Sequence, residues 1–296
     1  MVHEPRLVAD GFSFLEGPRW HDGRLYVSDF YTHRVLAFDP RGQVETVCTV
    51  LKQPSGLGFL PDGSLLVISM LDRRLLHLDG GRLVEVVDLT PLAPWHCNDM
   101  VVDAAGRAYV GNFGFDDSAD GKMQVTNLIC VDTDGSTRIA ASDLLFPNGM
   151  VITPEGRQML VAETFAARIS AFDIGQDGGL ANRRTWASFG ARVEETVAAA
   201  IGSQAPLPDG MAMDAEGALW IGDAAGTGAL RVREGGEILD FVPTGDLAVY
   251  AVALGGRDRR TLYLCAAPPL PHGRPKTELR AVLLSCPVQA PGAGLP

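Results

Sequence analysis

One short phrase recurs along the chain, and its spacing constrains the fold more than any other feature. The five clear copies begin at Glu16, Ser55, Asn98, Asn148 and Asp209, and a degenerate sixth begins at Tyr250. The clear copies are each followed by a turn that ends in glycine, at Gly23, Gly63, Gly106, Gly156 and Gly217, and then by a short β-type run. Repeats of roughly 40 residues with three or four short strands are the signature of propeller blades. The sequence therefore predicts an all-β fold, a six-bladed β-propeller.

The two ends of the chain are expected to close the ring. Residues 6–9 are a strand candidate that precedes the first phrase, and the last blade ends in an apolar run over residues 279–284. We expect the N-terminal strand to complete the last blade, because this removes an open sheet edge. Residues 1–286 then form a single propeller domain. The Pro-, Gly- and Ala-rich segment 287–296 is expected to be disordered.

One position of the phrase, called the slot here, carries residue types with chemistry. Counted back from the turn glycines, the slot holds Ser55, Asn98, Asn148 and Asp209, with Glu16 displaced by one in a shorter turn. First strands of blades line the central channel, so these side chains should converge on its axis. Two carboxylates and two carboxamides suit a hard dication such as calcium, with zinc, magnesium or manganese as alternatives. The other interpretation is that these residues only begin turns, although turn chemistry does not require glutamate.

A second polar ring is expected one strand further out, where the second strands end: Asp29, Ser69, Asn112, Glu163 and Asp223. These residues either orient the slot side chains or cap strand ends. The loops that follow carry apolar and aromatic side chains: Phe30, Tyr31, His33, Met70, Phe113, Phe115 and Phe165. An apolar wall over a polar floor is typical of a small-molecule pocket.

Two insertions interrupt the repeat, at residues 114–123 and about 191–208, and the second contains a helix candidate over residues 193–200. Long irregular insertions often carry function, so we expect them at the rim of the pocket or as a lid.

Charge and cysteine usage exclude several classes of protein. The net charge of −11 argues against nucleic acid or an anionic membrane as partner. Five scattered cysteines without CxxC spacing predict reduced thiols in a cytoplasmic protein. There is no signal-peptide pattern or membrane-length apolar run, and the histidines lack zinc-site spacing. The oligomeric state stays open.

Three ordered motifs resemble those of the SMP-30/gluconolactonase family, which includes regucalcin-like proteins. They are Glu16-Gly17-Pro18 followed by Trp20, then Pro147-Asn148-Gly149, then Pro208-Asp209-Gly210. The resemblance implies a six-bladed, calcium-dependent hydrolase in which Glu16, Asn148 and Asp209 bind the metal. It also implies that Asp209 transfers protons and that Asn98 contacts substrate or metal.

The chain departs from the sugar-lactonase pattern of that family at one position. The family's arginine, two residues before the asparagine, is replaced by His96. His96 and Phe165 are candidate substrate contacts, and Asp116 or Asp117 is the candidate for the family's acidic substrate-binding position. Because the loops are aromatic rather than hydrogen-bonding, we expect a less polar lactone or ester as substrate.

The sequence therefore predicts a metal-dependent hydrolase that opens a lactone or a related ester at the propeller channel. Two other classes stay open. A non-catalytic propeller would use the same mouth as a binding platform. A strictosidine-synthase-like propeller would be an enzyme without the metal, so metal content separates the two enzyme classes.

Overall fold

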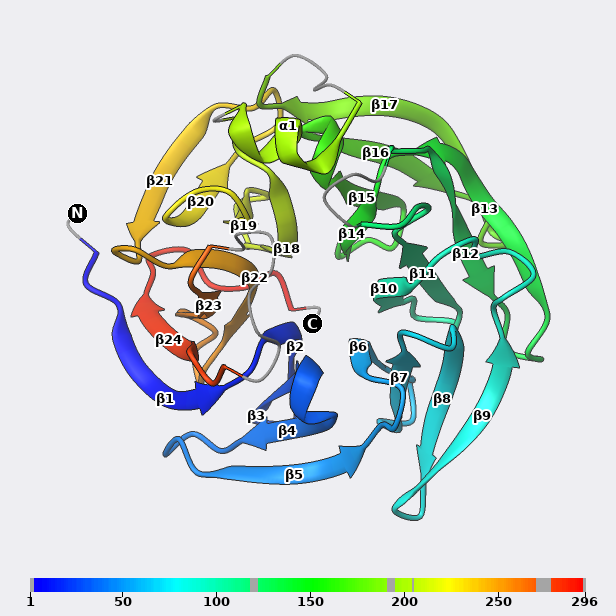
Figure 1. Cartoon of the computed structure of the whole chain (residues 1–296), viewed down its shortest axis with the longest axis horizontal. Coiled ribbons are helices and arrows are strands. Elements are labelled where there is room, and N and C mark those ends of the chain that lie inside the picture. The colour runs from blue at the N-terminus through cyan, green and yellow to red at the C-terminus, as the bar shows by residue number, and fades with distance from the viewer. Residues whose placement is uncertain (1–2, 118–121, 191–194, 204, 270–277, 295–296) are drawn as a thin grey trace.

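Six four-stranded antiparallel sheets surround a common axis, which confirms the six-bladed propeller (Figure 1). The computed structural model describes residues 3–117, 122–190, 195–203, 205–269 and 278–294. Short helices lie between strands: η1 (Phe30–Thr32), η2 (Thr164–Ala166) and α1 (Val197–Gly202). Among these described residues, no helix has the length and apolarity needed to cross a membrane.

Five blades each consist of four consecutive strands, with the innermost strand first. The first blade comprises β2 (Leu15–His21), β3 (Arg24–Asp29), β4 (Arg34–Phe38) and β5 (Val44–Thr49). The second comprises β6 (Pro54–Phe59), β7 (Leu65–Ser69), β8 (Arg74–Asp79) and β9 (Arg82–Asp88). The third comprises β10 (Cys97–Val102), β11 (Ala108–Asn112), β12 (Thr126–Val131) and β13 (Thr137–Leu144). The fourth comprises β14 (Pro147–Ile152), β15 (Gln158–Glu163), β16 (Arg168–Ile174) and β17 (Leu180–Ser188). The fifth comprises β18 (Pro208–Met213), β19 (Leu219–Asp223), β20 (Gly228–Val232) and β21 (Ile238–Pro243).

The sixth blade joins the two ends of the chain, as the sequence predicts. Its strands are β22 (Ala248–Gly255), β23 (Thr261–Ala267), β24 (Ala281–Pro287) and, outermost, β1 (Arg6–Phe12). In Figure 1, β1 in blue lies beside β24 in red, and Arg6 pairs with Ser285. His3 extends this closure to β21, because its Nε2 lies 2.8 Å from Asp240 Oδ2. The ring is thus closed by hydrogen bonds between the first and last segments.

The segment after β24 is ordered, so the expected disorder is wrong for residues 287–294. Its backbone hydrogen bonds join Val288 N to Arg260 O (2.9 Å), Gly292 N to Arg259 O (2.8 Å) and Ala293 N to Met213 O (2.9 Å). The side chains of Val288 and Ala290 are buried. A composition rich in Pro, Gly and Ala does not reveal these backbone partners, which lie at the end of β18 and in the turn between β22 and β23. Residues 295–296 lie outside the described range.

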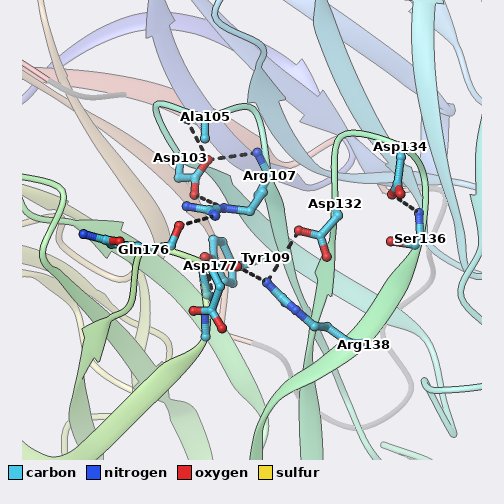
Figure 2. A network of polar contacts seen from close by, with 12 residues as sticks. Asp103, Ala105, Arg107, Tyr109, Asp132, Asp134, Ser136, Arg138, Gln176 and Asp177 are labelled. Atoms are coloured by element: carbon cyan, nitrogen blue, oxygen red, sulfur yellow. Dashed lines mark hydrogen bonds and ion pairs between the residues drawn. The ribbon is translucent and has the colours of Figure 1, made fainter.

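A polar network joins the third and fourth blades at turns remote from the start of the inner strands (Figure 2). Its hydrogen bonds between blades run from Arg107 Nη1 to Gln176 O (3.1 Å), from Tyr109 Oη to Gly178 O (2.8 Å) and from Arg138 Nη2 to Asp177 O (2.7 Å). Asp103 orients Arg107 by accepting its backbone N–H and its Nε–H. These contacts fix the spacing of two neighbouring blades, and hence of their inner strands.

Candidate functional site

Each copy of the repeated phrase forms a β-bulge in the innermost strand of its blade. In β14 the pairing passes from Pro147↔Glu163 to Met150↔Val161, so three steps on β14 match two on β15. A one-residue shift of the same kind occurs in β2, β6, β10, β18 and β22. A bulge bends its strand and re-aims a side chain. The repeat therefore places one side chain of each blade at an equivalent position, beside the bulge of the inner strand.

Glu16 occupies the same slot as the other copies. Leu15 pairs with Asp29 as Pro147 pairs with Glu163, so the residues that follow them, Glu16 and Asn148, are equivalent. In the sequence Glu16 stands one residue nearer to its turn glycine than the other slot residues do, but in the structure it occupies the equivalent position of its strand. The difference in spacing arises because the first hairpin closes around two residues, after the pair His21↔Arg24.

The residue after the slot is glycine in most copies. At these glycines the neighbouring inner strands lie too close together to leave room for a side chain. A Cβ on Gly149 would lie 2.4 Å from the carbonyl oxygen of Asp209, and one on Gly17 would lie 2.9 Å from that of Ser55. Gly17 also has a φ of +56°, a conformation that favours glycine. The phrase thus combines a functional side chain with the small residue that lets the inner strands converge.

The slot side chains of four blades meet at the floor of one pocket of about 280 Å³. Glu16, Asn98, Asn148 and Asp209 all line it, and each is less than a tenth exposed. Among the residues that the structure describes, no cluster of three or more His, Cys, Asp and Glu side chains is arranged to hold a metal. The expected ligands Glu16, Asn148 and Asp209 include only two residues of these four types. Their role as a metal site therefore stays a prediction.

The two floor carboxylates are compensated only in part: Gly17 N donates to Glu16 Oε2 (3.0 Å) and the backbone of Gly210 hydrogen-bonds to Asp209, but no cationic side chain of the described residues forms an ion pair with either. Burial raises the pKa of Glu16 well above its usual range, and the charges of Asp209 and Asp99 raise it further. Burial, followed by the charge of Asp99, likewise raises the pKa of Asp209. Within the described structure, Asp209 Oδ1 and Asn98 Nδ2 are buried without a hydrogen-bond partner. Such orphaned groups are costly unless something else satisfies them, and a dication among oxygen donors would fit.

The sequence did not predict a buried ion pair that lies next to the floor. Arg19 Nη2 lies 2.7 Å from Asp99 Oδ1, and both side chains are 7% exposed. Arg19 thereby compensates the charge of the third carboxylate of this region and leaves Glu16 and Asp209 as the two carboxyl groups without an ion-pair partner among the described residues. The only sequence signal was Asp99 itself, which stands where Gly17, Gly149 and Gly210 stand in other copies.

The pocket wall contains most of the apolar and aromatic residues expected there. Phe30, Tyr31, Met70, Phe113 and Phe165 line it together with His96. Phe115 is buried behind the wall against Phe146 and Phe165 (centroids 5.9 and 6.1 Å), and His33 is not among the lining residues. Asp116 does not line the pocket, whereas its neighbour Asp117 does. Which of the two aspartates lines the pocket depends on the course of an irregular loop, and no periodic pattern in the sequence predicts that course.

Three members of the second polar ring hold the backbone that leads into a slot residue. Asp29 Oδ1 accepts from Phe14 N (3.1 Å), Glu163 Oε2 from Leu145 N (2.9 Å), and Asp223 Oδ1 from Leu207 N (3.0 Å). These donors lie two or three residues before Glu16, Asn148 and Asp209. The ring therefore combines both expected roles, because it caps the entering loops and so positions the slots indirectly. Direct support comes from Thr164, whose Oγ1 accepts from Asn148 Nδ2 (3.2 Å).

Glu163 gives this ring a measurable pH dependence. Burial alone would raise its pKa, but hydrogen bonds from Arg168, Ser170 and Leu145 and the charge of Arg183 lower it. A lowered pKa means that Glu163 stabilises the fold above about pH 4.3, the unfolded value, and that this stability is lost as pH falls through the folded value. Glu163→Gln should lower the free energy of unfolding at pH 7 by about 2–3 kcal/mol. The loss stays below the ~3–5 kcal/mol typical of a fully buried pair, because both arginines are about a third exposed.

Urea unfolding from pH 7 down to pH 3.5 measures this difference, which should shrink in the acid range. Glu234→Gln is the matched control, because Glu234 pairs with Arg184 at 2.7 Å but is 60% exposed, and it should change stability little. A difference between Glu163→Gln and the native chain that is constant over the whole pH range would contradict the account.

The two insertions meet beside the pocket. An isolated bridge pairs Lys122 with Thr196, and Met123 N donates to Glu195 O (3.1 Å). Thr196 then caps α1 by accepting from Ala199 N. Helix α1 begins at Val197, later than expected, and it contributes Val197 and Ile201 to the pocket lining. Residues 118–121, 191–194 and 204 of the insertions lie outside the described structure, including the first two residues of the predicted helix.

The sequence and the fold both match known proteins. A family model for the SMP-30/gluconolactonase/LRE-like region matches residues 14–268. The chain is 28% identical over 267 residues to a pentonolactonase of Haloferax volcanii, covering 88% of this chain and 84% of the relative. It is 26% identical over 256 residues to a 6-deoxy-6-sulfogluconolactonase of Pseudomonas putida, covering 85% and 82%. A calcium-binding regucalcin of Agrobacterium tumefaciens shares the fold, with a TM-score of 0.78, 17% identity, and 100% and 97% of the two chains covered.

Proposed function

The chain belongs to the SMP-30/gluconolactonase/LRE-like family, and from that premise we propose that it is a divalent-metal-dependent hydrolase that opens a lactone. One observation carries this proposal beyond the family. Two buried carboxylates, Glu16 and Asp209, and two carboxamides, Asn98 and Asn148, line one pocket, and within the described residues neither carboxylate forms an ion pair with a cationic side chain. A purely binding platform has no need for such a costly floor.

Glu16, Asn148 and Asp209 would hold the cation, with Asn98 either as a further ligand or as a substrate contact. Calcium is the proposed ion, because all four side chains offer oxygen and two are charged. The regucalcin of similar fold is a calcium-binding protein, which supports the same choice. When bound, the cation would supply Lewis-acid polarisation of the lactone carbonyl.

Asp209 is the proposed general base. A carboxylate has two oxygens, so one of them could face the cation while the other accepts a proton from a water that attacks the carbonyl carbon, and Oδ1 has no hydrogen-bond partner in the described structure. The ring C–O bond then breaks, and the same proton passes to the departing alkoxide oxygen. The product is a hydroxy acid, and no further reactant is needed. The five free thiols suit a reducing compartment, so the cytoplasm is the proposed location.

Ring opening of a lactone panel tests the proposed function. The purified protein with added calcium should release one acid equivalent per lactone, followed with a pH indicator, well above the rate in buffer. Heat-unfolded protein is the control for non-specific base catalysis. If no lactone or aryl ester is hydrolysed above the buffer rate, the proposal is wrong.

A further inference from the structure

The pocket walls above the floor are formed by two aromatic groups. On one side Phe146 packs against Phe113 and Phe165, with ring centroids 4.4 and 4.7 Å apart. On the other side Phe14 packs against Tyr250 and Phe30, at 4.6 and 5.3 Å. All six side chains line the pocket. Such walls favour ligand groups that gain from leaving water.

Helix α1 adds an aliphatic surface to the first of these walls. Val197 and Ile201 are four residues apart, so they lie on one face of the helix, and both line the pocket. Val197 is buried against the aromatic cluster, whereas Ile201 is 37% exposed. The partly exposed Ile201 is therefore a wall residue whose remaining surface a ligand can cover.

Several polar groups of the pocket already have partners within the protein. Thr164 Oγ1 donates to Pro208 O (2.9 Å) and accepts from Asn148. Gln53 Nε2 donates to Met70 Sδ (2.9 Å). Tyr250 Oη donates to Pro268 O (3.4 Å). Fewer hydrogen-bonding groups therefore remain for a ring with several hydroxyl groups, and each hydroxyl that is buried without a partner would lower affinity roughly ten- to a hundredfold.

We infer that the substrate is a lactone with an alkyl or aryl substituent, and that this substituent lies against Phe146, Phe165 and Ile201. The inference rests on the proposed lactone hydrolysis and specifies its substrate class. The floor takes the polar ester group, because the charged and carboxamide side chains are there. The apolar wall takes the substituent, because it offers contact surface and few hydrogen-bonding groups.

Catalytic efficiency on four lactones tests the inference. They are δ-valerolactone, a pentyl-substituted δ-lactone, dihydrocoumarin as the aryl case, and glucono-δ-lactone. The pentyl compound should exceed δ-valerolactone in kcat/KM by about tenfold or more, the aryl compound should do so after division by its faster rate in buffer, and the gluconolactone should be lowest. A kcat/KM for gluconolactone equal to or above the others would overturn the inference and retain the proposed function. Hydrolysis of none of the four would overturn both.

A variant of the wall residue separates this specificity from a general loss of activity. Ile201→Ala should lower kcat/KM on the pentyl-substituted lactone by about tenfold, mainly through KM, and change δ-valerolactone less than twofold. Alanine is a strong helix former, so α1 should persist. Ile238→Ala is the matched control, because Ile238 is 49% exposed on the outer strand β21, and it should alter neither substrate. Equal losses on both lactones in Ile201→Ala would overturn the assignment of this wall.

Discussion

Asp209→Asn should lower kcat for lactone opening by about two to four orders of magnitude, the range that a general base contributes. Asparagine keeps an oxygen at the pocket floor but cannot take a proton from water. It also removes one of the two charges that the floor presents to a cation. The effect should be in kcat more than in KM, because the wall residues that bind the substrate are unchanged. Steady-state kinetics at saturating calcium measure it.

Glu16→Gln is the comparison that separates a base from a ligand. It removes the other floor charge and leaves Asp209 in place, so its main effect should be weaker cation binding. Excess calcium should restore much of the activity of Glu16→Gln and little of the activity of Asp209→Asn. If excess calcium rescues both variants equally, Asp209 is a ligand only, and the base must be another group.

Removal of the cation with a chelator should abolish lactone hydrolysis and leave the fold intact. The six sheets are held by their own buried side chains and by closure through β1 and β24, so β-sheet circular dichroism should not change. The midpoint of thermal unfolding should fall, because a ligand at a hundredfold excess over its Kd contributes about 2.7 kcal/mol. Calcium should restore both activity and midpoint. Full activity in thoroughly demetallated protein would contradict the metal dependence, and loss of the β-sheet signal would make the ion structural.

The sequence specifies the blades and the slot because both depend on local, repeated signals. A turn glycine and an apolar run recur in each copy, and Gly149 marks where two inner strands nearly touch. Because these signals recur in every copy, Glu16 could be assigned to the slot although its turn is shorter. Closure of the ring by residues 6–9 could be predicted because this strand precedes the first blade and the last blade needs a further strand.

The features that the sequence did not specify depend on contacts between distant residues. Arg19 and Asp99 are 80 positions apart, and each lies within a repeat copy that gives no sign of the other. The order of residues 287–294 depends on backbone groups of the fifth and sixth blades. The meeting of the two insertions, through Met123 and Glu195, likewise has no periodic signal.

Calcium titration calorimetry on demetallated protein tests the central claim, that the slot residues hold a dication at the pocket floor. We expect one bound ion per chain in the native protein. Affinity should be at least tenfold weaker in Glu16→Gln and unchanged in Asp134→Gln, whose carboxylate lies on an exposed turn. No bound ion in the native protein, or equal affinity in Glu16→Gln, would contradict the account.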